Sequence, residues 1–294
     1  MSKIVNVGGL GLLLLTLGAN AHAAPILGPD LASFAVLGAA GVTNVPTSTI
    51  DGNLGSAPNG SIGGGYTFTS GGPQANTAIA QQAQLDLDTA IGVLSGLGPG
   101  TVLTNADLAG LTLAPGVYTV HSGVSNLTGA LTLDGGGNVN AFWVFQMDSD
   151  LITSVGSSMN VINTGTGAGV FWNVRSSATL NTGSVFEGNI LALTSITMGD
   201  AVTLNCGRAL AANGSVTLIH DTINLGCFGT GEEGSNGLAG TGLDVVGGGV
   251  IIDTGTGGVV AGPIPEPFSL VMFGAGGLVV AYGYRRGSPY KRAV

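Results

Sequence analysis

Threonine recurs at nearly even spacing in the second half of this chain, within short segments that alternate apolar and polar residues. One central residue from each segment gives Thr132, Ile152, Thr179, Thr197 and Thr217, separated by 20, 27, 18 and 20 residues. A period near twenty, with several short strands in each repeat, is typical of a β-solenoid. Coils stacked about 4.8 Å apart would set the four threonines in one column of hydroxyl and methyl groups on a flat surface.

The residues that flank these threonines predict the core. Successive side chains of a strand point to opposite faces, so the neighbours of each outward threonine point inward. They are all apolar: Leu131, Leu133, Leu151, Ala178, Leu180, Ile196, Met198, Val216 and Leu218.

One segment, residues 74–97, predicts a helix. Its apolar residues recur at three- and four-residue intervals, and glycine and proline stand at both ends. A helix of about 24 residues is roughly 36 Å long, which matches about seven coils stacked at about 4.8 Å. We therefore expect a mainly β fold, a β-helix with one long α-helix packed alongside it.

Both ends of the chain predict processing during export. Residues 1–23 combine Lys3, an apolar run and Ala21-His22-Ala23, a pattern that signal peptidase cleaves. Residues 265–294 begin with a proline–glutamate–proline motif and continue with an apolar stretch and a basic cluster that would orient a membrane segment. The motif consists of Pro265, Glu266 and Pro267.

This tail resembles the PEP-CTERM sorting signal. The resemblance implies cleavage by an exosortase after transient anchoring in the inner membrane. It also implies a secreted or cell-surface location in a Gram-negative bacterium that makes exopolysaccharide. Residues 229–264 are rich in Gly and Thr and predict a flexible linker, so the folded domain is expected over residues 24–228.

Cys206 and Cys227 are the two cysteines of the chain, and they lie 21 residues apart, about one coil. Adjacent coils would bring their Cα atoms near disulfide distance, and an exported protein can be oxidised. Metal binding by this pair is less favoured, because no histidine or second cysteine pair accompanies it. We expect a disulfide, no metal and no cofactor.

The distribution of charge along the chain excludes nucleic acid as an expected partner. The chain of 294 residues has a net charge of −9. Between the predicted signal peptide and the apolar stretch of the tail it contains no lysine and only Arg175 and Arg208, whereas all sixteen acidic residues lie between Asp30 and Glu266. A nucleic-acid partner would require a basic surface, so none is expected.

Catalysis is not expected either. The three histidines are His22, in the predicted signal peptide, His121 and His220, and no Gly-x-Ser-x-Gly motif accompanies them. A β-helix hydrolase of the pectin lyase type would need clustered carboxylates, but the acids here are scattered singly. The sequence therefore predicts a protein without enzymatic activity.

Several segments between residues 31 and 225 carry a family resemblance. They include Phe34-Ala-Val-Leu-Gly38, Asp51-Gly-Asn-Leu-Gly55, Leu113-Ala-Pro-Gly-Val-Tyr118 and Gly207-Arg-Ala-Leu-Ala211. In this order they resemble the microbial ice-binding (antifreeze) protein family. The resemblance implies a right-handed, discontinuous β-helix of triangular cross-section with a long helix alongside, and one flat face that adsorbs to ice. Ile152, Asp148 and Asp150 interrupt the row of small and hydroxyl-bearing residues that active members carry.

Two functions remain open from the sequence. The first is adsorption of a secreted monomer to ice through the threonine column, which would inhibit ice growth and recrystallisation. The second is a structural or adhesive role in the extracellular matrix, with exopolysaccharide as the partner and the threonines incidental. Retention on ice or on exopolysaccharide would distinguish them.

Overall fold

The computed structural model describes residues 26–227, 232–240, 244–246, 249–252 and 259–260. The chain divides into two units, Met1–Ile264 and Pro265–Val294. The predicted signal peptide and the tail that begins with Pro265, Glu266 and Pro267 lie outside the described residues. Within the described ranges, none of the helices combines the length and the apolar composition that crossing a membrane requires.

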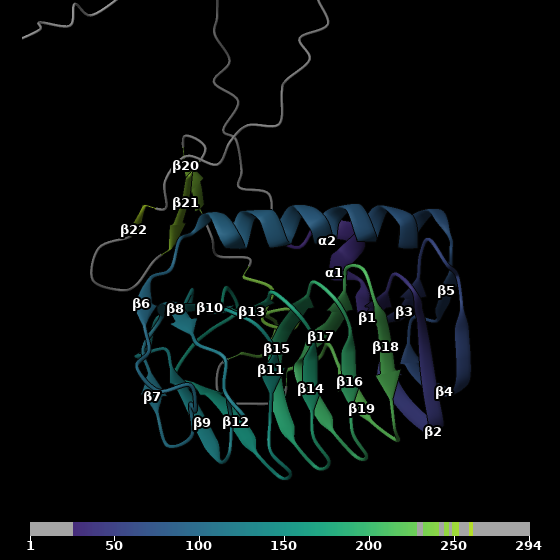
Figure 1. The fold of residues 1–294 in the computed structure, drawn as a ribbon. Coiled ribbons are helices and arrows are strands. Elements are labelled where there is room, and N and C mark those ends of the chain that lie inside the picture. The colour runs from purple at the N-terminus through teal and green to yellow at the C-terminus, as the bar shows by residue number, and fades with distance from the viewer. Residues whose placement is uncertain (1–25, 228–231, 241–243, 247–248, 253–258, 261–294) are drawn as a thin grey trace, which may run out of the picture. The chain divides into compact units, whose positions relative to one another are not determined.

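The body is a stack of coils whose strands pair in parallel in one 19-stranded sheet, as Figure 1 shows. The mainly β prediction is therefore confirmed. In each coil the chain passes through three faces in the same order, which we name the helix-covered face, the narrow face and the wide face.

The helix-covered face carries strands whose side chains are buried on both sides where α2 lies over them. Its strands are β1 (Phe34–Gly38), β3 (Asn53–Ser56), β5 (Pro73–Ala75), β6 (Thr101–Val102), β8 (Gly116–Val120), β10 (Phe142–Met147) and β13 (Gly169–Val174).

The other two faces carry shorter strands that alternate buried and accessible residues. The narrow face has β11 (Leu151–Ile152), β14 (Ala178–Leu180), β16 (Ile196–Met198) and β18 (Ser215–Leu218). The wide face has β7 (Thr112–Leu113), β9 (Ala130–Asp134), β12 (Ser158–Ile162) and β19 (Thr222–Asn224).

Four longer strands bend at a corner and so serve two faces. β2 (Gly41–Asp51) and β4 (Ile62–Ser70) run from the narrow to the wide face, and β15 (Val185–Ala192) and β17 (Thr203–Ala211) run from the wide to the helix-covered face. Positive φ angles at Gly188 (91°) and Cys206 (50°) mark the bends of β15 and β17, a conformation that side chains usually disfavour.

The coils are not stacked in chain order. Strand β1 pairs with β17, with Val36 beside Ala209, and β2 pairs with both β18 and β19. The N-terminal coils thus extend the C-terminal end of the stack. Helix α2 (Ala78–Gly96) then carries the chain along the body to the opposite end, where β6 begins (Figure 1).

The prediction of one long helix over residues 74–97 is not confirmed at that length, because α2 has 19 residues. The preceding residues are held elsewhere: Pro73 and Gln74 pair with Leu54 and Gly55 as strand β5. Thr77 then caps the helix by accepting a hydrogen bond from the Ala80 amide at 3.4 Å. At about 1.5 Å per residue the helix is roughly 28 Å long. A four-residue helix, α1 (Pro29–Ala32), lies beside it.

Two apolar clusters hold the body together. The first fills the interior of the coils, where every residue predicted to point inward, from Leu131 to Leu218, is at most 1% exposed. It includes Phe145 and Trp172, whose ring centroids stack at 3.9 Å. The second joins α2 to the helix-covered face through side chains such as Leu87 and Phe171. The apolar interior of the coils and the apolar contact between α2 and the helix-covered face are thus separate layers.

Residues 229–264, predicted as a flexible linker, contain ordered structure. Residues 232–240, which we call the strap, pack on the body, and Ser235 and Leu238 are fully buried there. An antiparallel sheet follows, made of β20 (Asp244–Val246), β21 (Gly249–Ile252) and β22 (Val259–Val260). Composition alone does not indicate that residues 232–240 pack in this way, because the strap is fixed by hydrogen bonds from the body to its backbone.

Candidate functional site

Three of the four predicted threonines lie together on the narrow face. Thr179 pairs with Thr197, and Thr197 pairs with Thr217. Thr43 of β2, which the sequence did not single out, continues the row beside Thr217, and the two hydroxyl oxygens are 3.4 Å apart. At the other end Ile152 pairs with Thr179 and interrupts the row, as predicted.

Thr132 does not belong to this row. It lies on the wide face, where it pairs with Thr112 and Asn160. Asn126, and not Thr132, lies beside Ile152, and each donates its backbone amide to an oxygen of the other. The alignment was wrong because each coil contains three alternating segments, so a segment of one face can be matched by spacing to a segment of another.

The narrow face offers a single row of outward threonines, because its own strands have only two to four residues. Thr197 and Thr43 are exposed, and Thr179 and Thr217 are half-buried. Beside the row, serine hydroxyls are engaged along the edge: the Ser215 amide donates to Ser195 Oγ at 3.3 Å. This face is therefore one threonine wide, and polar groups along its edge are hydrogen-bonded to one another.

The wide face carries a longer column of small side chains. In register order it consists of Ala130, Ser158, Val185, Thr203, Thr222, Thr49 and Thr67. No member bears a charge, and each is exposed or half-exposed. Neighbouring members are one strand spacing apart, about 4.8 Å.

A second column runs parallel to the first, two residues further along each strand except at Ser70, which lies three residues beyond Thr67 because the register shifts there. It consists of Thr112, Thr132, Asn160, Glu187, Asn205, Asn224, Asp51 and Ser70. The Asn224 side-chain amide donates to Asn205 Oδ1 at 3.2 Å, which fixes the spacing of the two side chains. Outward positions on one strand are about 6.6 Å apart, so the two columns form a two-dimensional net.

Of the two carboxylates of the second column, Glu187 is withdrawn from the surface and Asp51 is half-exposed. Glu187 is only 9% exposed and accepts a hydrogen bond from the Val161 amide at 2.9 Å. Burial, with a smaller contribution from the nearby Glu232, raises the pKa of Glu187 to about 7, although the hydrogen bond from the Val161 amide lowers it. Asp51 lies at the end of the column and accepts hydrogen bonds from Ser70 Oγ and the Gly226 amide. The centre of the wide face thus presents hydroxyl, methyl and amide groups.

Acid–base and metal chemistry have little support in the described ranges. His121 Nδ1 lies 2.6 Å from Asp148 Oδ2, and His220 Nδ1 lies 3.6 Å from Asp200 Oδ1. All four side chains are exposed, and no nucleophile is bonded to either histidine in the described part. No group of three or more potential metal ligands gathers in these ranges.

The disulfide Cys206–Cys227 and the buried Arg208, which we together call the clasp, lie at the corner beside the wide face. The predicted disulfide between Cys206 and Cys227 is present, with the Cα atoms 4.5 Å apart. Arg208 is fully buried and donates to the carbonyl oxygens of Ala32, Asn236 and Gly237. Burial lowers the pKa of Arg208 to about 9. Arg208 therefore satisfies backbone carbonyl groups at this corner.

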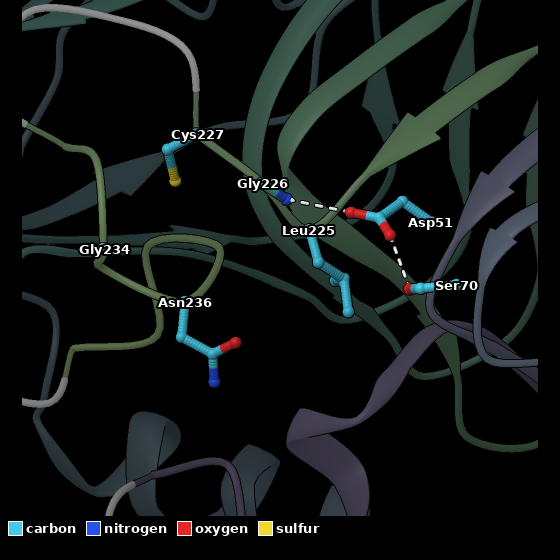
Figure 2. A pocket seen from close by; sticks show the side chains of 7 residues that line it. All are labelled: Asp51, Ser70, Leu225, Gly226, Cys227, Gly234 and Asn236. Atoms are coloured by element: carbon cyan, nitrogen blue, oxygen red, sulfur yellow. Dashed lines mark hydrogen bonds between the residues drawn. The ribbon is translucent and has the colours of Figure 1, made fainter.

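Between this clasp and the end of the wide face lies an open pocket of about 450 Å³. Figure 2 shows Asp51 with its hydrogen bonds to Ser70 and Gly226 on one side, and Gly234 and Asn236 of the strap on the other. Leu225 extends between them. Sequence reasoning did not identify this pocket.

The wide-face residues Thr203, Thr222 and Thr49 were also missed, although the sequence contains a signal for them. Thr203-Leu-Asn205 and Thr222-Ile-Asn224 repeat a Thr-x-Asn pattern at an interval of 19 residues. Thr49-Ile-Asp51 varies the same pattern, but it stands more than 150 residues earlier. Only the discontinuous stacking, which places β2 after β19, brings the three segments together.

Comparisons with known proteins agree with this architecture. A family model described as Ice-binding-like matches residues 36–224. An ice-binding protein of Nostoc sp. (strain HG1) is 45% identical over 208 residues, which cover 68% of this chain and 74% of the relative. One of Colwellia sp. is 30% identical over 211 residues, covering 66% and 81%.

Solved structures of ice-binding proteins are also similar. One from an Antarctic Biological Consortium has a TM-score of 0.61 and 31% identity, over 76% of this chain and 96% of that one. One from the ascomycete Antarctomyces psychrotrophicus has a TM-score of 0.59 and 35% identity, over 67% and 96%. Sequence and fold therefore lead to the same assignment: this chain belongs to the ice-binding-like family.

Proposed function

We propose that this protein adsorbs to ice through the wide face and thereby inhibits ice growth and recrystallisation, without catalysis. The observation that carries the proposal is the in-register column that ends in Thr203, Thr222, Thr49 and Thr67. The names of the similar proteins, which describe ice binding, support it.

The physical argument starts from how a protein surface can hold ordered water. A net of hydroxyl, methyl and amide groups about 4.8 Å by 6.6 Å, fixed by strand geometry, offers repeated positions for water molecules. The coils are rigid because both layers beneath them are close-packed. Ordering water on such a surface costs little protein entropy, since side chains such as threonine are already restricted. Adsorbed molecules would then make the ice front curve between them.

The narrow face is the second candidate surface, since it holds the sequence-predicted Thr179, Thr197 and Thr217. It has one outward threonine per coil, whereas the wide face has two outward positions on most strands. Because an ice plane extends in two dimensions, the wider net makes more simultaneous contacts. We therefore assign the main adsorption surface to the wide face.

The test is a bulky substitution on each face. We expect Thr222→Tyr to remove most of the thermal hysteresis and recrystallisation inhibition of the purified protein, since the ring would hold ice away from the column. Thr197→Tyr, on the narrow face, should have a much smaller effect. Leu85→Tyr is the matched control, because Leu85 is 60% exposed on helix α2.

Each other outcome has a definite meaning. Loss of activity in Thr197→Tyr alone would move the ice-binding surface to the narrow face. Equal activity of all three variants would exclude both surfaces. A wild-type protein that leaves ice growth unchanged at high concentration would exclude the function itself.

We further propose the processing and shape that the sequence resemblances imply. Residues 1–23 act as a signal peptide, and the tail with Pro265, Glu266 and Pro267 acts as a PEP-CTERM-like signal for an exosortase. This would place a monomeric, right-handed and triangular β-helix outside a Gram-negative cell. Mass spectrometry of the protein from its producer tests this: an intact N-terminus and an intact tail would contradict it.

A further inference from the structure

The pocket between the strap and the wide face has the composition of a small-ligand site. Its volume of about 450 Å³ falls within the range of ligand pockets in proteins. It is lined by Asp51, Ser70, Leu225, Gly226, Cys227, Gly234 and Asn236. These are a few polar groups around one aliphatic side chain, the usual arrangement in which polar groups orient a ligand and apolar contact stabilises it.

The two walls of the pocket offer different hydrogen-bonding groups. On one wall the Asp51 carboxylate accepts hydrogen bonds from Ser70 Oγ at 2.5 Å, from Thr69 Oγ1 at 3.3 Å and from the Gly226 amide at 3.3 Å. These bonds fix its orientation, and a carboxylate has further lone pairs with which to accept donors from a ligand. This wall therefore favours a ligand that carries hydroxyl or ammonium groups.

The opposite wall, formed by the strap, is held in place by the buried Arg208. Arg208 donates to the backbone carbonyl oxygens of Asn236 at 2.8 Å and of Gly237 at 3.0 Å. The Asn236 side chain is exposed and makes no hydrogen bond within the described ranges. It can both donate to and accept from a ligand. A fixed backbone with a free amide side chain is a preorganised polar contact.

The charged groups at the pocket limit the class of ligand that it can bind. Of the two arginines in the described ranges, Arg208 is buried and Arg175 lines a different pocket, so no cation faces an anionic ligand here. An ammonium ligand would favour several carboxylates or aromatic rings around it, and the pocket has one carboxylate and no ring. A neutral sugar has both an apolar ring face for Leu225 and hydroxyl groups for Asp51 and Asn236.

We infer that this pocket binds one unit of a neutral, hydroxyl-rich glycan, at the end of the wide face. Asp51 and Asn236 hold the hydroxyl groups from opposite walls, and Leu225 contacts the ring. Asp51 and Ser70 also close the second column of the wide face, so a bound glycan would leave the column of Thr203, Thr222 and Thr49 uncovered. The site therefore adds an attachment point without using the ice-binding column.

The test uses the whole purified chain and named probes: maltotriose, cellotriose and β-1,4-galactotriose, with spermine as the ammonium probe. Binding is followed by saturation-transfer NMR and calorimetry. We expect at least one trisaccharide to bind and spermine not to compete with it. Two variants probe the walls. Asn236→Gly is suited to the positive φ of 54° and leaves the Arg208 bonds to the backbone, and Asp51→Asn keeps the shape. Each should weaken binding at least ten-fold.

Thr197→Ala, on the narrow face, is the control and should bind the trisaccharide as the wild type does. Absence of binding by all three sugars overturns the inference, as does binding that survives both Asp51→Asn and Asn236→Gly. Competition by spermine would reassign the pocket to ammonium ligands. Ice activity is measured separately on the same variants, so failure of this inference is distinguishable from failure of the proposed function.

Discussion

The helix-covered face and the wide face are built from the same coils but present opposite surfaces. Strand β17 serves both: Thr203 lies outward at its start, and Leu210 lies outward near its end, beneath the helix. On the helix-covered face, outward residues such as Phe171 and Leu210 are large and apolar and are fully buried beneath α2. Gln146 and Asn173 are the polar exceptions, and they donate hydrogen bonds to Leu94 and Ser95 at the end of the helix. On the wide face they are small and polar, and they are left uncovered. The backbone is shared, so the outward side chains decide which face is covered.

Because only one of the two faces is covered, the helix-covered face contributes stability and the wide face is left free for function. Burial of apolar area against α2 stabilises the fold by about 25 cal/mol per Å², whereas half-exposed threonines contribute little. A face that adsorbs to ice must stay uncovered, so it cannot contribute that stabilisation to the fold. Substitutions on the two faces should therefore change different measurable properties.

The largest effect on stability is expected under the helix. Phe171→Ala removes a fully buried ring that packs on Phe142, with centroids 5.3 Å apart, and leaves a cavity beneath α2. We expect a loss of about 4 kcal/mol in the free energy of unfolding, measured by urea denaturation. Thr203→Ala on the wide face is the control, with an expected change within about 0.5 kcal/mol. Equal losses would contradict the division between the two faces.

A somewhat smaller loss is expected at the corner that joins the two faces. Arg208→Met fills much of the same space but leaves the carbonyl oxygens of Ala32 and Asn236 and the side-chain oxygen of Asn189 without their donor. Unsatisfied buried acceptors should cost about 3 kcal/mol in total. We also expect faster proteolysis within the strap, followed by mass spectrometry of the fragments. A variant that unfolds and is cleaved like the wild type would show that the clasp does not fix the strap.

The buried edge of the wide face should give a smaller, pH-dependent effect. Because the pKa of Glu187 is raised from 4.5 to about 7 in the folded state, the native state holds its proton more tightly than the unfolded state. The free energy of unfolding should therefore fall as pH rises from about 4.5 to about 7, and level off above that. Glu187→Gln should reduce this slope, while Asp221, whose pKa is also raised to about 7, retains part of it.

The same variants provide the check on that prediction. Urea denaturation at several pH values, with Thr197→Ala as the control, gives the slope directly. An unchanged slope in Glu187→Gln would mean that Glu187 titrates normally in the folded protein.

The sequence predicted local features well, and the disulfide and inward residues illustrate why. Alternation fixes which side chain of a strand is buried, so Leu131 and Met198 could be assigned from their neighbours alone. Cys206 and Cys227 could be paired because one coil separates them along the chain. These inferences depend on contacts between adjacent coils in sequence.

Features that depend on distant contacts were missed. Thr49 and Thr222 are neighbours only because α2 returns the chain to the far end of the stack, and no local period reveals that. Thr132 was assigned to the wrong face, since spacing cannot distinguish three similar segments within one coil. The strap was read as a spacer because its anchors, Arg208 and Asn189, lie elsewhere in the chain.

The smallest expected effect is that of Thr222→Val, which asks whether shape or hydrogen bonding matters on the wide face. Valine keeps the volume and one methyl group but lacks the hydroxyl, and Thr222 is half-exposed, so stability should change by less than about 0.5 kcal/mol. Val185 already occupies the same column beside Thr203 and is 38% exposed, so the column tolerates valine at one position. We therefore expect recrystallisation inhibition to weaken only slightly, in contrast to Thr222→Tyr, which disrupts the flat surface. If Thr222→Val lost as much activity as Thr222→Tyr, the hydroxyl group would be the essential element, and Val185 would mark a defect in the ice-binding column.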